Sequence, residues 1–160
     1  MLNQKNSVKL IAWVISFEII GFLLGLVTQA NIYSWYEGLD KSILTPPGWV
    51  FSVVWPILYV CLAIVGFILW QKRDNPPHKI VFHLYWVQML MNWMWTPLFF
   101  QWHWLALSFS WIVVMVGLSV AIITLAAKNK EKAIALLMLP YLLWLTFAGY
   151  LNGVIWMLNT

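Results

Sequence analysis

The chain has 160 residues, of which 63% are hydrophobic and 9% charged, with a formal net charge of +4. Soluble domains have roughly 25% charged residues and cannot bury this much apolar surface. The hydrocarbon of a bilayer can, because one spanning helix needs about 20 apolar residues. The composition excludes an ordinary soluble domain and predicts an all-α integral membrane protein, with residues 1–160 as one domain. Because the basic residues lie between apolar runs, we expect membrane lipid around the protein and no nucleic-acid partner.

Five apolar runs follow one another along the chain, each about as long as a membrane-spanning helix. They cover residues of about 8–28, 47–70, 79–100, 105–127 and 134–157. The runs do not alternate apolar and polar residues, which argues against strands. The first run is longer than the core of a signal peptide. The sequence therefore predicts a bundle of five transmembrane helices.

The basic residues predict how this bundle lies in the membrane. Eight of the nine Lys and Arg residues lie before the first run, between the second and third, or between the fourth and fifth. In a five-span bundle these three segments fall on one side, and Lys41 is the exception. The side rich in Lys and Arg faces the cytoplasm. We therefore expect a cytoplasmic N-terminus and a C-terminus outside.

One connection, residues 29–46, is much longer than the others. It contains Trp35, Tyr36 and Leu39 and leads into two consecutive prolines. It is too apolar for a solvated linker, and long structured loops often carry function. We expect this loop to cover a ligand site.

Three of the runs place aromatic side chains on one helical face. The faces carry Phe51, Trp55, Leu58, Tyr59 and Leu62; Tyr85, Gln88, Asn92, Trp95 and Phe99; and Tyr141, Trp144, Ala148, Leu151 and Ile155, with Asn152 at the margin of the last. Amides in hydrocarbon need partners, so they face the bundle interior. They either bond neighbouring helices or orient a ligand in an aromatic cavity. The aromatic loop favours the cavity.

Little in the sequence indicates conventional catalysis. There is no Walker loop, dinucleotide fingerprint or nucleophile elbow. His78, His83 and His103 lack metal-ligand spacing. Glu18 is the only acid well inside an apolar run; it makes a structural hydrogen bond or takes part in proton coupling, and we expect the former. We expect no metal site, no required cofactor and no acid–base or nucleophilic chemistry.

Several segments, in the right order, resemble the translocator protein family (TSPO/MBR), also called tryptophan-rich sensory proteins or peripheral-type benzodiazepine receptors. The matching segments are Trp35-Tyr36-x-x-Leu39-x-Lys41, Pro46-Pro47-Gly48-Trp49-Val50-Phe51, Trp55-x-x-Leu58-Tyr59, Gln88-x-x-x-Asn92-x-x-Trp95-x-Pro97-Leu98-Phe99-Phe100, and Pro140-Tyr141-Leu142-x-Trp144-x-x-Phe147-Ala148 followed by Leu151-Asn152. The resemblance covers roughly residues 33–159. It implies a five-helix bundle, a homodimer, and a pocket under the first loop that accepts porphyrins and synthetic isoquinoline or benzodiazepine ligands.

Carried over by position, the resemblance implies nine ligand-binding residues. They are Tyr36, Pro46, Trp55, Tyr59, Asn92, Trp95, Trp144, Ala148 and Leu151. Animal members also bind cholesterol through a tyrosine followed by a basic residue. Tyr150 is followed by no basic residue here, which argues against cholesterol at this motif and favours a bacterial cell membrane over a mitochondrial one.

The resemblance leaves three functions open. The first is a membrane receptor or binding protein for porphyrins (tetrapyrroles) and similar flat hydrophobic ligands, active in tetrapyrrole or stress sensing. The second is an enzyme that degrades porphyrin in light and oxygen, in which Trp55 and Trp144 would be the catalytic residues. The third is a carrier of such ligands. We expect the first, because indole faces stack on a flat macrocycle.

Overall fold

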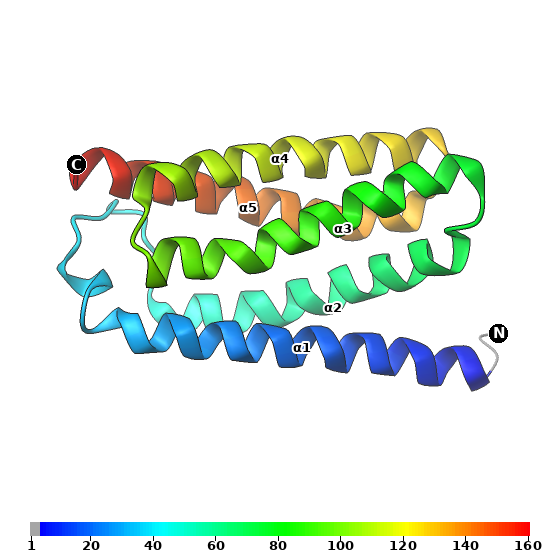
Figure 1. Ribbon diagram of the computed structural model, residues 1–160, viewed down its shortest axis with the longest axis horizontal. Helices are drawn as coiled ribbons and strands as arrows, with labels where there is room; N and C mark the ends of the chain where they lie inside the picture. Colours follow the sequence, from blue (N-terminus) through cyan, green and yellow to red (C-terminus); the bar gives the residue numbers. More distant parts are fainter. Residues whose placement is uncertain (1–3) are drawn as a thin grey trace.

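The computed structural model describes residues 4–160, and over this range it is built from five long α-helices without a strand (Figure 1). The helices are α1 (Gln4–Ile32), α2 (Gly48–Lys72), α3 (Pro76–Thr96), α4 (Leu105–Lys128) and α5 (Lys132–Leu158). A short 3-10 helix, η1 (Tyr36–Gly38), lies in the first loop, and a π-helical segment, η2 (Pro97–Gln101), follows α3. The all-helical fold class is confirmed.

Helix α1 is longer than the apolar run 8–28 by four residues at each end. Its last turn uses polar residues that hydropathy does not count: Asn31 Nδ2 donates to the carbonyl of Val27 at 2.9 Å. The prediction of a loop over 29–46 was therefore too long at its start, and the loop runs over 33–47. The bounds of α2, α4 and α5 lie within two residues of their predicted runs.

Helix α3 begins three residues before the predicted run 79–100. Pro76 and Pro77 occupy its first turn, where the backbone N–H that proline lacks has no helical partner to bond. The carbonyl of Asn75 accepts the backbone N–H of His78 at 2.9 Å and so closes the first turn. Hydropathy misses this turn because its residues are polar or are prolines.

The helices form one bundle in which α2 packs beside α1 and α5, and α4 packs beside α3 and α5. The start of α1 lies at the same end of the bundle as the α2–α3 and α4–α5 connections (Figure 1). The loop 33–47, the α3–α4 connection and the C-terminus lie at the opposite end. We call these the basic end and the loop end, because the Lys and Arg residues outside the loop lie at the first.

Within residues 4–160, four helices are long and apolar enough to cross a membrane: α1, α2, α4 and α5. Their outward faces carry large exposed apolar side chains, such as Phe22 (67% exposed) and Leu143 (71%). Such a surface needs hydrocarbon around it. The chain is thus an integral membrane protein. Helix α3 is less apolar, because it carries His78 and Lys79 near its start and Gln88 and Asn92 further along.

An ionic cluster joins three helices at the basic end. The Glu131 carboxylate, just before α5, accepts from Lys72 Nζ of α2 and from His78 Nε2 of α3 at 2.8 Å. The Lys72 ammonium, and then His78, hold the pKa of Glu131 below its usual range. Because this pKa is lower in the folded than in the unfolded protein, the ion pairs of Glu131 stabilise the fold at neutral pH. Their contribution is lost as the pH falls through the pKa of Glu131 in the folded protein.

Candidate ligand-binding site

A buried polar network crosses the centre of the bundle. Tyr141 OH of α5 accepts from Gln88 Nε2 at 2.7 Å and from Asn92 Nδ2 at 3.0 Å, both on α3. Tyr59 OH of α2 donates to Asn92 Oδ1 at 3.2 Å. All four side chains are at most 5% exposed. Gln88 and Asn92 therefore bond neighbouring helices, which is one of the two roles that the sequence allows for these amides.

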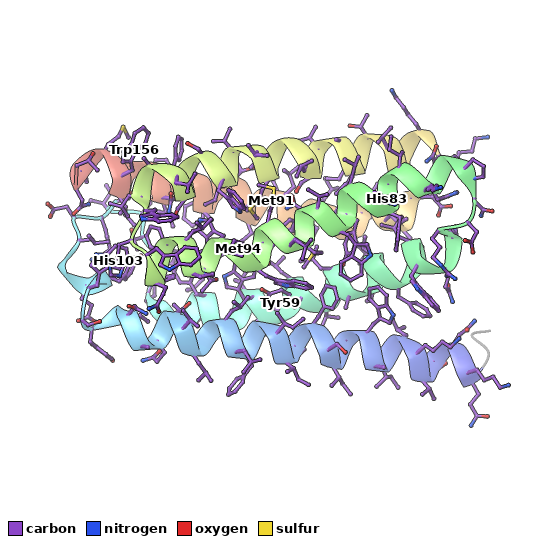
Figure 2. The ribbon with its side chains drawn as sticks, viewed as in Figure 1. Tyr59, His83, Met91, Met94, His103 and Trp156 are labelled. Atoms are coloured by element: carbon purple, nitrogen blue, oxygen red, sulfur yellow. The ribbon has the colours of Figure 1, made fainter. Side chains whose placement is uncertain are left out.

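Three tryptophans lie between this central network and the loop end. Helix α2 runs away from the loop end, and Trp55 precedes Tyr59 by one turn, so Trp55 lies nearer the loop end. The Trp55 ring is 5.5 Å from that of Tyr59. Trp95 and Trp144 follow the network residues on α3 and α5, which run toward the loop end. Figure 2 shows Tyr59 about midway along the bundle and His103 at the loop end. The loop-end half of the interior is therefore rich in indole rings.

Residues of the loop close this half of the bundle. The Tyr36 ring lies 5.6 Å from that of Phe100 and 6.2 Å from that of Phe99. Trp35 stacks on His103 at 3.9 Å with an interplanar angle of 19°. Ile155 of α5 belongs to the same buried cluster as the two phenylalanines. The loop thus covers the end of the interior, and burial raises the pKa of the Tyr36 phenol.

Hydrogen bonds hold the loop in this place. Lys41 Nζ donates to the carbonyls of Tyr36, Glu37 and Leu39 at 2.7 to 3.1 Å. The Asn159 amide, at the end of α5, bonds both the N–H and the carbonyl of Asp40 at 2.9 Å. The sequence does not reveal the Asn159 contact, because it joins residues 119 positions apart. Lys41, in contrast, can be singled out from the sequence, because it is the one basic residue of the loop.

Several buried polar atoms of the interior have no hydrogen-bond partner within residues 4–160. Those at the central network and toward the loop end are Gln88 Oε1, Trp95 Nε1, Trp144 Nε1, Ser108 Oγ, and both Oδ1 and Nδ2 of Asn152. We call them the free polar atoms. Glu18 Oε1 of α1 is also buried without a partner within residues 4–160, so the structural hydrogen bond expected of Glu18 is not found there. Leaving a buried donor or acceptor unbonded costs about 1–3 kcal/mol. A ligand that bonds to them would recover part of this free energy.

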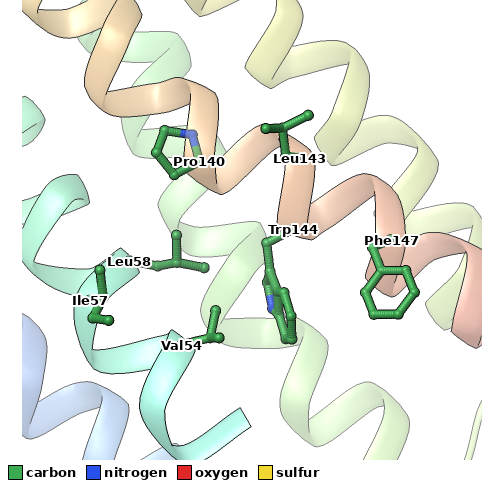
Figure 3. Close-up of a pocket in the computed structure, with 7 residues that line it drawn as sticks. All are labelled: Val54, Ile57, Leu58, Pro140, Leu143, Trp144 and Phe147. Carbon is green, nitrogen blue, oxygen red and sulfur yellow. The ribbon is translucent and has the colours of Figure 1, made fainter. Parts of the chain in front are cut away.

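A groove between α2 and α5 opens sideways beside the interior (Figure 3). Its volume is about 390 Å³, and it is lined by Val54, Ile57, Leu58, Pro140, Leu143, Trp144 and Phe147. Ile57 is 58% and Leu143 71% exposed, so the groove faces the surrounding hydrocarbon. The Trp144 ring lies between the two helices (Figure 3) and meets Phe51 edge-on at 5.4 Å. It therefore forms the wall between the interior and the groove.

The nine residues expected at the site fall into three groups. At the central network, Tyr59 contacts both of its expected partners: its hydroxyl donates to Asn92, and its ring lies against that of Trp55. Trp95 stacks on Phe99 at 5.1 Å, and Tyr36 meets the same ring from the loop. The others lie apart from these contacts: Trp144 in the α2–α5 wall, Ala148 and Leu151 half-buried and buried on α5, and Pro46 half-buried before α2.

Two residues of the loop-end interior stand outside the expected nine. Ser108 is 0% and Asn152 2% exposed. Helical phase placed Asn152 only at the margin of its aromatic face. Ser108 belongs to the fourth run, which carries no aromatic face, but the recurrence of Ser108, Ile112, Met115 and Ser119 at helical spacing is a signal for a buried face.

These features define a polytopic helical membrane protein whose aromatic, partly polar interior is covered by one loop. The chain belongs to the TspO/MBR family, which matches residues 12–157. It is 32% identical over 155 residues to the tryptophan-rich protein TspO of Archaeoglobus fulgidus, covering 96% of this chain and 99% of the relative. It is 31% identical to the translocator protein of Bos taurus (87% and 83% covered) and 27% identical to the tryptophan-rich protein TspO of Bacillus cereus (79% and 81%).

Proposed function

We propose that the protein is a membrane receptor for porphyrins and similar flat hydrophobic ligands, which bind between the central network and the loop. One observation carries this proposal: the loop-end interior, which is rich in indole rings, contains buried polar atoms that have no hydrogen-bond partner within residues 4–160. Pockets for small molecules are mostly apolar, with a few polar groups that fix the orientation of the ligand. The names of the relatives, translocator protein and tryptophan-rich protein, fit this proposal.

A porphyrin suits such an interior because it is a flat aromatic disc. Aromatic pairs contribute about 0.5–1.5 kcal/mol each beyond the burial of their area. Trp55, Trp95 and Trp144 offer rings from three different helices. The nine residues expected from the resemblance are the proposed site, and no resident cofactor or metal is part of it.

Titration of the purified protein with protoporphyrin in the dark tests this function. We expect the tryptophan fluorescence to fall and to saturate near one porphyrin per chain, because the ligand lies against indole rings. Micelles without protein, containing free tryptophan, control for quenching by partition into detergent. A quench that never saturates, or that matches the micelle control, would count against the receptor. Light-dependent product would favour degradation, and flux across sealed vesicles would favour a carrier.

We further propose that α3 also crosses the bilayer, which makes five spans with a cytoplasmic N-terminus. Helix α3 lies within the bundle and runs from the basic end to the loop end, in the opposite direction to its neighbours α2 and α4 (Figure 1). Its amides are buried against other helices rather than exposed to lipid. The basic end then faces the cytoplasm. The homodimer and the bacterial cell membrane implied by the resemblance stay predictions.

Cysteine labelling in intact cells checks the orientation. In a Cys61→Ser background, a cysteine placed within residues 74–77 is expected to react only with reagents that enter the cytoplasm. A cysteine placed after Asn159 is expected to react with impermeant reagents from outside, because an odd number of spans separates the two ends. Labelling of both positions from the same side would exclude five spans, and reversed labelling would exclude the orientation.

A further inference from the structure

Asn152 is placed to face the same interior as Tyr141. It follows Tyr141 by eleven residues of α5, which at 100° per residue brings it back to within about 20° of the same direction. At 1.5 Å per residue it lies about 16 Å closer to the loop end. Its side chain is 2% exposed, and neither amide atom has a partner within the described chain.

A second free polar atom lies at the same level of the bundle. Gly153, next to Asn152, packs so closely on the Phe109 ring of α4 that an added Cβ would come within 2.9 Å of it. Ser108 directly precedes Phe109, is fully buried, and its Oγ has no partner in residues 4–160. Ile155, one turn beyond Asn152, packs in the cluster beneath Tyr36. The level of Asn152 and Ser108 therefore lies just below the loop.

The two polar levels of the interior differ in what they can offer a ligand. At the central level, Tyr59, Asn92 and Tyr141 already bond one another, and Gln88 leaves one acceptor free. At the loop-end level, the Asn152 amide offers two N–H donors, and the Ser108 hydroxyl offers one O–H donor. Carboxylates need donors, and an N–H bond to an ionised acceptor is stronger than one to a neutral group.

We propose that Asn152, together with Ser108 at the same level of the bundle, binds a carboxylate of the ligand and thereby sets the orientation of the ligand. The acidic edge of the ligand lies beneath the loop, and its apolar edge lies toward the Tyr59–Asn92 network. A carboxylate placed at the loop end is also closer to water, which lowers the free-energy cost of inserting its charge. This role rests on the proposed function. It specifies which edge of the ligand the protein recognises.

Two porphyrins that differ in their carboxylates test the role of Asn152. Protoporphyrin IX carries two carboxylates, and octaethylporphyrin carries none. Asn152→Leu is expected to weaken protoporphyrin binding at least tenfold, or about 1.4 kcal/mol, and to change octaethylporphyrin binding less than twofold. Thr146→Val is the matched control, because Thr146 lies on the exposed face of α5 and its hydroxyl bonds its own helix. It should change neither affinity.

Three outcomes decide the proposal. Unchanged protoporphyrin binding in Asn152→Leu overturns it, and so does an equal loss for both porphyrins, which would mean that the amide only supports packing. If Asn152→Leu does not fold, Asn152→Ser, which is smaller and keeps one donor, is expected to show the same preference in weaker form, and its absence overturns the proposal. If the unmodified protein binds neither porphyrin, the proposed function itself fails.

Discussion

Trp144→Ala and Ala148→Phe are each expected to weaken protoporphyrin binding at least tenfold, or about 1.4 kcal/mol. Trp144→Ala removes the ring that separates the interior from the α2–α5 groove, and with it the stacking face and a free N–H. Ala148→Phe acts in the opposite way. Ala148 lies one turn after Trp144 and is half-buried, so a phenyl ring fills volume that the ligand needs. Fluorescence quenching titrations in the dark measure both affinities.

Two variants with outward-facing side chains control for changes in fold. Leu143→Phe adds a ring to the same helix but on its lipid face, where Leu143 is 71% exposed. Trp102→Ala removes an indole that is 47% exposed beyond the end of α3. Both should bind like the unmodified protein. Parent-like affinity in Trp144→Ala and Ala148→Phe together would place the ligand elsewhere.

The helices were predictable because each needs a long apolar stretch, and hydropathy reports that stretch directly. It reports less well where a helix continues in polar residues, as α1 does through Asn31. It also cannot show how a helix ends against its neighbours. Asn129 Nδ2 donates to the carbonyl of Pro77 at 2.7 Å, a contact between two connections that only the folded bundle brings together.

The sequence predicts which side chains face the interior, but it does not predict which hydrogen-bond partners they find there. Helical phase placed Gln88, Asn92 and Tyr141 on interior faces, and their burial confirms it. It could not show that Tyr141 would accept from both amides, because this depends on the depth at which α3 and α5 pack. For the same reason it could not show that the Asn152 amide finds no partner within residues 4–160. Free polar atoms become visible only when every neighbouring helix is in place.

Slow, light-dependent consumption of bound protoporphyrin in the presence of oxygen is the second expected result. Degradation is the alternative function, and it would need little from the protein, since the hard chemistry belongs to the ligand. An excited porphyrin can take an electron from a nearby indole or pass its energy to oxygen. Trp55 and Trp144 offer indoles from two neighbouring helices, α2 and α5: the Trp55 ring lies beside Tyr59, and the Trp144 ring lies beside Phe51.

Replacing these indoles by phenyl rings separates binding from chemistry. Trp55→Phe and Trp144→Phe should keep much of the affinity, because phenylalanine still stacks, but should lose most of the consumption, because its ring is much harder to oxidise. Absorbance of the porphyrin, followed under constant light and in the dark, measures the rate. Trp102→Phe is the control, since that indole lies on the surface at 47% exposure. Equal rates in all four proteins would mean unassisted bleaching of the ligand, and the receptor would then stand without the enzyme.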